Sequence, residues 1–475
     1  MASMATSFAE QKSEDGASTS ATSIPVSEQP LMKGPPEELS PTQVYKLNSR
    51  LWFELCIGAF ALMWLLVVVT QIVNSVPTYM SKTGYKLPSY YCKDVCSISL
   101  VEMIPIGFEM DYVSKDSIYS AWLSLLEAAE KTIDVYSFTW RLQGADQNYD
   151  LTFEGNDLFE VLQKFDSDRK GKLNIFVDNS TWHGITLREV SQLENYHVQL
   201  MHFAPANETH TTAWVVDKKH LHLGTASVDW RLFRQGKEMG VLIKNCSCLA
   251  EELHDIFHAL TVQPSAIDIR PELPKLHRID FDNEYEMDSF FTISGPMKHF
   301  IKGISTEDAI VKAIKNADEF IYISVVKYYP FRKELPGVLY LKKIHEALLG
   351  AIERQNVSIK LLTSWTEGRD EEEQYLNSFQ RYAQEITGRN FQLRRFAFPK
   401  FSNKNASTDH NMFLVTDNTA FIGISDWSAD YFFDTPGVGL VLQEVNRTSN
   451  QANQTIRAQL IELFQRDWNS RYAFA

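Results

Sequence analysis

The stretch HTTAWVVDKKHLHLGTASVDW, residues 210–230, returns about two hundred residues later as HNMFLVTDNTAFIGISDW, residues 410–427. In each copy a histidine opens an apolar run, an aspartate closes it seven residues on, and a glycine follows a second short run. Alternating small, aromatic and β-branched residues predict strands, and the DKK and DNT segments predict tight turns between them. Each copy is therefore expected to form a hairpin-like unit that begins at a histidine.

This duplicated pattern resembles the phospholipase D superfamily, whose signature is a repeated His-x-Lys-x4-Asp followed by Gly-Ser/Thr. Three further segments are similar to its type II membrane branch, which holds endolysosomal 5′-exonucleases and an inactive relative. These segments are CKDVCSISLVEMIPIGF (92–108), KEMGVLIKNCSCLAEEL (237–253) and GISDWSADYFFDTPGVGLVL (423–442). The resemblance covers roughly residues 50–475.

The resemblance implies a metal-independent and cofactor-independent site in which one histidine from each copy meets at the interface between two halves. His210 is the expected nucleophile, which would form a phosphohistidine, and His410 is the expected acid. Glu238 matches the carboxylate that orients the nucleophile, whereas the second copy has Gly437 there. The candidate catalytic residues are His210, His410, Glu238, Asp217 and Asp417, and the candidate substrate-binding residues are Thr212, Thr225, Asn411, Met412 and Ser425. For Asp217 and Asp417, a structural role that fixes the hairpin turns through local backbone amides is favoured.

The chain departs from the signature at one position in each copy. Where the family has lysine, this chain has Thr212 and Met412. Removing one donor that stabilises developing charge typically costs about 3–4 kcal/mol, so losing two lysines should leave little turnover. Asp426, which stands where the family often has asparagine, would repel a phosphate when ionised. The nearby cations Lys218, Lys219, Lys400 and Lys404 are expected on turns or flanking loops.

Length and charge bound these interpretations. With 475 residues, 44% of them hydrophobic, the chain can form two globular units with their own cores. A net charge of −14 gives no overall attraction to nucleic acid or anionic lipid, although a local basic groove stays open.

The N-terminal region differs from the rest. Residues 1–50 are rich in Ser, Thr, Glu and Pro, which predicts a disordered cytoplasmic tail. Residues 55–73 carry no charge and are long enough to cross a bilayer, so 51–74 is expected to be a retained signal anchor. The alternative is a buried core helix, which normally shows a polar face.

All N-x-S/T sequons follow this segment, at Asn179, Asn207, Asn245, Asn356, Asn405, Asn446 and Asn453. Glycosylation requires a secretory compartment, so the sequons favour a single-pass type II protein with a lumenal or extracellular body. The choice among ER, Golgi, endolysosome and cell surface stays open.

Four cysteines form two close pairs, Cys92 with Cys96 and Cys246 with Cys248. In an oxidising compartment they are expected to bridge the start of the body to the end of the first copy. Three connectivities are open, and the resemblance implies Cys92 with Cys248 and Cys96 with Cys246. A zinc site is the rival interpretation, although the Cys-x-Cys spacing is tight for one.

Alternating helical and strand patterns predict an α/β fold of two tandem repeats, 75–270 and 271–475, each a mixed sheet flanked by helices. In the first repeat, helices are expected at 117–132, 157–166, 187–194 and 249–262, with strands at 133–140, 173–179 and 197–203. In the second, helices are expected at 307–317, 339–354, 371–387 and 456–468, with strands at 320–326, 357–365 and 391–398. Residues 327–340 look like an inserted loop.

Two functions follow. The favoured one is a degenerate phospholipase D-like membrane protein that hydrolyses poorly or not at all and binds a phosphodiester ligand or a protein partner. The alternative is an active phosphodiesterase on single-stranded nucleic acid or phospholipid. A homodimer stays open.

Overall fold

The computed structural model describes most of the chain from Ser89 onward and a few residues before it. The described residues are 57–59, 63–64, 89–114, 116–144, 149–168, 171–178, 188–193, 196–201, 211–261, 275–299, 301–334, 337–354, 356–387, 390–398, 411–423, 426–445 and 455–475. The chain divides into two units, Met1–Tyr79 and Met80–Ala475. Among the described residues, no helix combines the length and the apolar character needed to cross a membrane. The predicted tail and most of the predicted anchor lie outside the described residues.

The first sheet has the strand order β6-β5-β3-β7-β8-β10-β1. Its first three strands are parallel to one another, and every pair from β3 to β1 is antiparallel. The strands are β1 (Ser89–Met103), β3 (Thr132–Ser137), β5 (Lys172–Asp178), β6 (Tyr196–Met201), β7 (Thr212–Val216), β8 (His220–Gly224) and β10 (Glu238–Lys244). The β7–β8 pair is the hairpin predicted for the first copy, and its turn places Asp217 and Lys218 at positive φ.

The second sheet has the order β18-β17-β13-β19-β20-β22-β12-β11. From β18 to β12 it has the same succession of parallel and antiparallel pairs as the first sheet, and β11 adds one more antiparallel strand. Its strands are β11 (Leu276–Phe281), β12 (Tyr285–Ser294), β13 (Phe320–Val325), β17 (Ser358–Ser364), β18 (Phe391–Phe396), β19 (Phe413–Thr416), β20 (Thr419–Ile422) and β22 (Gly437–Glu444). The β19–β20 pair is the hairpin predicted for the second copy. The mixed-sheet α/β class expected from the sequence is therefore confirmed.

Strand β1 belongs to both sheets. Its residues 97–103 pair with β10, and its earlier residues pair with β11. Two disulfides, Cys92–Cys248 and Cys96–Cys246, join this earlier part of β1 to the start of α6 (Ser247–Thr261). The pairing that the resemblance implied is confirmed, and the four sulfur atoms are used in these bridges.

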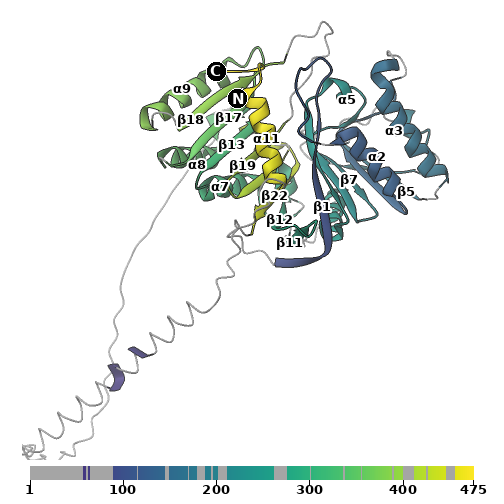
Figure 1. The fold of residues 1–475 in the computed structure, drawn as a ribbon, viewed down its shortest axis with the longest axis horizontal. Helices are drawn as coiled ribbons and strands as arrows, with labels where there is room; N and C mark the ends of the chain where they lie inside the picture. The colour runs from purple at the N-terminus through teal and green to yellow at the C-terminus, as the bar shows by residue number, and fades with distance from the viewer. Residues whose placement is uncertain are drawn as a thin grey trace, which may run out of the picture. The chain divides into compact units, whose positions relative to one another are not determined.

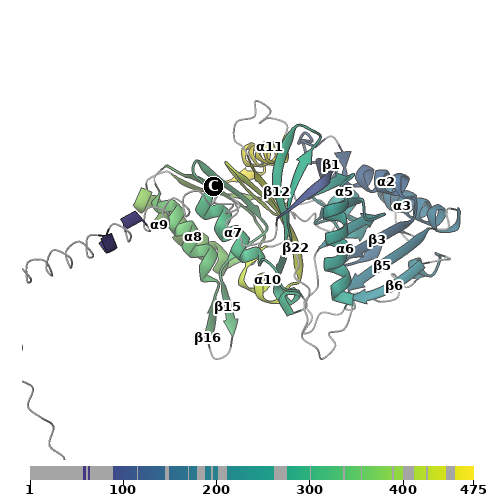
Figure 2. The same cartoon turned by 90° about the horizontal axis from the view of Figure 1, so that it is seen from below.

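Helices cover both faces of each sheet (Figures 1 and 2). The first sheet forms one hydrophobic core with α2 (Ile118–Ala128) and α3 (Tyr149–Asp168). The second sheet forms another with α7 (Thr306–Asn316), α8 (Lys342–Glu353) and α9 (Asp370–Thr387). Helices α6 and α11 (Ile456–Asn469) share a central core that takes buried residues from both sheets. The two sheets are therefore joined through hydrophobic packing as well as through β1.

Short elements complete the fold. They are β2 (Asp116–Ser117), β4 (Trp140–Arg141), β9 (Val228–Asp229), α5 (Leu232–Gln235), η2 (Gly295–His299), β14 (Tyr328–Tyr329), β15 (Phe331–Glu334), β16 (Gly337–Tyr340), β21 (Trp427–Ser428), α10 (Ala429–Asp434) and β23 (Ala473–Phe474).

The prediction of a loop at 327–340 is wrong. The segment contains β14 and a β15–β16 hairpin that projects from the second sheet's helices (Figure 2). The ring of Phe331 stacks on that of Tyr340 with 5.1 Å between centroids, a cross-strand pair that stabilises a hairpin. Pro330 stands between β14 and β15 and not within a strand, so it does not remove a ladder hydrogen bond.

Candidate functional site

Both predicted histidines, His210 and His410, lie outside the described residues, as does Ser425. The residue after each histidine is described. The Oγ1 atom of Thr211 accepts a 3.1 Å hydrogen bond from the amide of Val438 in β22, so the first copy begins in contact with the second half. The carbonyl oxygen of Asn411 accepts a 3.3 Å hydrogen bond from the hydroxyl of Ser324 in β13.

The two motif aspartates hold the beginnings of the central strands. Asp217 accepts hydrogen bonds of 2.7–2.8 Å from the amides of Glu130, Lys131 and Thr132, where β3 begins. Asp417 accepts bonds of 2.9 and 3.2 Å from residues 318 and 319, just before β13. The structural role favoured from the sequence agrees with these contacts. The amides, however, are not local, because they lie 85–99 residues away in the chain.

Glu238 is fully buried at the start of β10, where the resemblance places the orienting carboxylate. Its Oε2 atom accepts a 2.5 Å hydrogen bond from the hydroxyl of Thr225. Thr225 is held in turn by the backbone of Met239, whose carbonyl oxygen accepts a 3.0 Å bond from the Thr225 amide. The structure therefore brings together two of the candidate residues, one from the glycine-following segment and one from the return strand.

The two positions that lack lysine are buried. Thr212 is 0% exposed, and its hydroxyl has no hydrogen-bond partner among the described residues. Met412 is 5% exposed and packs against Tyr431 and Val326 in a small apolar cluster. The second lysine position has thus become part of the hydrophobic packing, and an ammonium group there would be desolvated.

Lysines near the motifs do not fill these positions in the described part of the chain. Lys218 and Lys219 are exposed on the hairpin turn, as the sequence predicted. Lys400 and Lys404 lie outside the described residues. Asp426 accepts bonds from the amide and the hydroxyl of Ser428, so it helps to begin α10.

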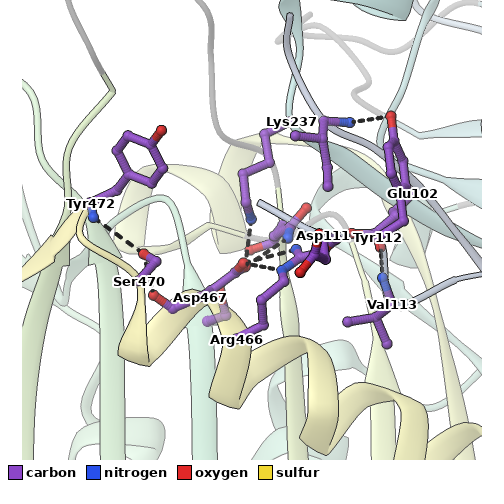
Figure 3. A network of polar contacts seen from close by, with 12 residues as sticks. Glu102, Asp111, Tyr112, Val113, Lys237, Arg466, Asp467, Ser470 and Tyr472 are labelled. Carbon is purple, nitrogen blue, oxygen red and sulfur yellow. Dashed lines mark hydrogen bonds and ion pairs between the residues drawn. The ribbon is translucent and has the colours of Figure 1, made fainter. Parts of the chain in front are cut away.

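A buried ion pair not predicted from the sequence lies beside the site (Figure 3). The ammonium of Lys237, the residue before Glu238, is 2.6 Å from Asp467 Oδ2 in α11, and both side chains are 1% exposed. The same oxygen accepts a 3.3 Å hydrogen bond from the side-chain amide of Asn411, the residue after His410. One carboxylate therefore contacts residues adjacent to both predicted half-sites.

The ion pair extends into a larger network. Arg466 lies 2.8 Å from Asp467 and 2.8 Å from Glu102 of β1. In the part of the network that the structure describes, two cations, Lys237 and Arg466, face two anions, Asp467 and Glu102, so the charge of Lys237 is already paired with a carboxylate. One sequence signal could have pointed to the network. Asp467 falls on the buried face of α11 with Ile456, Leu460, Leu463 and Phe464, where an apolar residue is expected.

The sequence analysis also missed a matched pair of buried carboxylates. Glu189 accepts hydrogen bonds from the amides of Leu142 and Gln143, which follow β4, and Glu372 accepts one from the amide of Tyr328 in β14. Burial raises the pKa of each carboxyl to about 7. Since β4 and β14 pair with β9 and β21 just after the two motifs, these carboxylates support equivalent positions in the two halves.

Other predicted residues take structural places. Trp230 and Trp427, which end the two motif stretches, are 4% and 1% exposed, so both are packed in the core. Of the sequon asparagines, Asn245 and Asn356 are described and exposed, whereas Asn179, Asn207, Asn405, Asn446 and Asn453 lie outside the described residues.

The chain is similar to known proteins over most of its length. A family model described as PLD3/4, PLD-like domain, matches residues 113–401. The chain is 30% identical over 411 residues to the 5'-3' exonuclease PLD3 of Xenopus tropicalis, covering 80% of this chain and 81% of that protein. It is also 30% identical over 415 residues to the 5'-3' exonuclease PLD4 of Mus musculus, with 80% and 79% covered.

A third relative carries a different description. The chain is 27% identical over 446 residues to the inactive phospholipase D5 of Mus musculus, with 88% of this chain and 81% of that protein covered. Among solved structures, phosphatidylserine synthase of Haemophilus influenzae matches 79% of this chain and 89% of its own, with a TM-score of 0.54. At 11% identity, that likeness concerns the fold alone.

Proposed function

The chain belongs to the family described as PLD3/4, PLD-like domain, and we propose that it keeps the family's fold while hydrolysing phosphodiesters poorly or not at all. The burial of Met412 among Val326 and Tyr431 carries this proposal. At this position the family signature has a lysine, and here the side chain is integrated into apolar packing. The family's relatives include both exonucleases and a protein described as inactive.

The two missing lysine charges would have stabilised the transition state of phosphodiester hydrolysis. A phosphoryl group in the transition state carries charge on its equatorial oxygens, and preorganised cations stabilise it. Thr212 offers one neutral hydroxyl and Met412 offers no donor. Two absent donors, each worth on the order of a hundredfold to a thousandfold in rate, outweigh the retention of both histidines.

The remaining residues keep the roles that the family resemblance gives them. His210 would attack phosphorus and His410 would protonate the leaving oxygen, while Glu238 would orient the imidazole of His210. The buried Thr225–Glu238 hydrogen bond supports this orienting role, because it fixes one carboxylate oxygen. This retained geometry favours a second candidate function, an active phosphodiesterase. In either case we propose a phosphodiester ligand, such as single-stranded nucleic acid or phospholipid.

We also propose the topology and the duplication expected from the sequence. The strand succession that the two sheets share from β6 to β1 and from β18 to β12, with Asp217 matched by Asp417 and Glu189 by Glu372, supports two tandem repeats. The uncharged segment at 55–73 and the sequons that follow it support a single-pass type II protein with a lumenal or extracellular body.

The test is hydrolysis by the purified full-length chain of a 5′-ended single-stranded oligonucleotide and of phosphatidylcholine, at acidic and neutral pH. We expect the wild-type rate to equal the protein-free background. Thr212→Lys/Met412→Lys should raise it, and adding His210→Ala should remove the gain. Thr212→Ser/Met412→Leu is the matched control and should stay at background. Wild-type turnover as fast as that of Thr212→Lys/Met412→Lys, and abolished by His210→Ala, would overturn the proposal in favour of the active phosphodiesterase.

A further inference from the structure

A pocket of about 380 Å³ lies between β1 and the start of α6, within the described residues. We call it the β1–α6 pocket. Its wall includes Cys92 of β1 and Cys248 of α6, which form one of the two disulfides. None of the candidate catalytic or substrate-binding residues lines it.

The two disulfides differ in access. Cys248 is half-buried and lines the β1–α6 pocket together with Cys92. Cys96 and Cys246 are 0% exposed and do not line it. Thiol–disulfide exchange needs in-line approach of a thiolate to a sulfur atom, so access separates the two bridges. The Cys92–Cys248 disulfide, which we call the outer bridge, therefore borders the pocket through the half-buried Cys248. The Cys96–Cys246 disulfide, which we call the inner bridge, is buried away from it.

The outer bridge links strand β1 to helix α6. Cys92 lies at the irregularity in β1 between residues 89–91 and 95–96, both of which pair with β11, whereas α6 packs on the first sheet. Beside the bridge, the amide of Ser247 donates a 2.7 Å hydrogen bond to Asp94. If the outer bridge opens, this hydrogen bond, the inner bridge and the hydrophobic packing of α6 still hold α6 against β1.

The charged residues of the β1–α6 pocket favour cationic thiols over anionic thiols. Its wall carries four carboxylates and two lysines, an excess of negative charge. Glu252 is paired with His277 at 2.7 Å, and Asp94 is engaged with Ser247, but Glu251 and Asp255 are exposed. A thiol that carries a positive charge is therefore concentrated near the bridge, and an anionic thiol is repelled.

We propose that the Cys92–Cys248 disulfide is a thiol-exchange site for small cationic thiols. A thiolate attacks Sγ of Cys248, forms a mixed disulfide there and releases Cys92 as a thiolate. A second thiol molecule attacks the mixed disulfide and leaves Cys248 as a thiol. In total one protein disulfide is reduced to two thiols, and two small thiols are oxidised to one disulfide.

The experiment uses the folded full-length chain and compares cysteamine, which is cationic, with 3-mercaptopropionate, which is anionic. Free thiols are trapped by alkylation at intervals, and each cysteine is quantified by peptide mass spectrometry. We expect Cys92 and Cys248 to be labelled at least about tenfold faster than Cys96 and Cys246. We expect a cysteamine adduct on Cys248, and a preference for cysteamine that shrinks at high salt.

Two double variants at exposed residues separate the effect of charge from that of access. Glu251→Gln/Asp255→Asn should reduce the preference for cysteamine, because it removes the exposed carboxylates of the β1–α6 pocket. Glu346→Gln/Glu353→Gln on α8 changes the net charge equally but lies outside the pocket, so it should keep the preference. Equal labelling of all four cysteines, labelling only in denaturant, or the same response in both double variants would overturn the proposal.

Discussion

The ammonium of Lys237 lies 2.6 Å from the carboxylate of Asp467, and 230 residues of chain separate the two. Lys237 precedes β10 of the first sheet, and Asp467 belongs to the last long helix, α11. The pair therefore joins the two halves of the fold at a point where both charges are excluded from water. Replacing one residue, and then both, separates the destabilisation caused by an unpaired buried charge from the contribution of the ion pair to stability.

Lys237→Met should destabilise the protein by about 3–5 kcal/mol, because it leaves the network with two carboxylates and one guanidinium. Lys237→Met/Asp467→Leu should recover part of this loss, since Arg466 and Glu102 then remain as a balanced pair. The measurement is the free energy of unfolding from urea denaturation. A double variant less stable than the single variant would contradict this account.

The matched control is an exposed ion pair in the same region. Arg471 lies 2.7 Å from Glu109, and their side chains are 63% and 72% exposed. Arg471→Met should leave the urea midpoint close to that of the wild type, because solvent and salt screen exposed pairs. An equal loss in both variants would show that burial is not the cause.

His222 should make the protein acid-sensitive. It is 0% exposed on β8, both ring nitrogens lack a hydrogen-bond partner among the described residues, and burial lowers its pKa to about 3. The unfolded chain takes up this proton below about pH 6.5, whereas the folded protein does not until about pH 3. Stability contributed by the neutral imidazole is therefore lost as pH falls, by about 2 kcal/mol at pH 5.

The check is the pH dependence of unfolding in His222→Leu. Its stability should fall less than that of the wild type between pH 7 and pH 5, by about 2 kcal/mol. Parallel curves of unfolding free energy against pH for the wild type and His222→Leu would contradict the prediction.

Glu372 should change the pH dependence of stability in the direction opposite to that of His222. Burial raises its carboxyl pKa from 4.5 to about 7, against the lowering effect of Arg369. Stability contributed by the protonated carboxyl is complete below pH 4.5 and is lost as pH rises through 7, by about 3 kcal/mol. Glu372→Gln should flatten stability between these limits, as measured by denaturant unfolding across pH. Glu189→Gln should do the same in the first half, and an unchanged slope in both variants would contradict the assignment.

The sequence predicted the hairpins and most helices because their signals are local. The apolar run closed by Asp217 and the one closed by Asp417 each specify a strand and its turn within a few residues. Helices such as α11 show their buried face through spacing alone. The α/β class followed from the order of these elements.

The rest depends on contacts between distant segments. Strands β11 and β12 were not predicted, although they pair with each other and extend the second sheet to β1. Strand β1 itself mixes charged and cysteine residues, because one part pairs with β10 and another with β11, so no single alternation runs through it. The Lys237–Asp467 pair follows only from the packing of α11 against the first half.

Asp217 gives the last prediction. Its carboxylate accepts the amides of Glu130, Lys131 and Thr132 and so fixes the start of β3 to the hairpin turn. Asp217→Ala leaves these donors without the charged acceptor and should destabilise by about 2–4 kcal/mol. Asp217→Asn keeps one acceptor oxygen and should lose less. Lys218→Ala, at the exposed next residue of the same turn, is the control for the turn itself. Since the role is structural, hydrogen exchange at the start of β3 should quicken in Asp217→Ala but not in Lys218→Ala, and equal exchange in both would refute the argument.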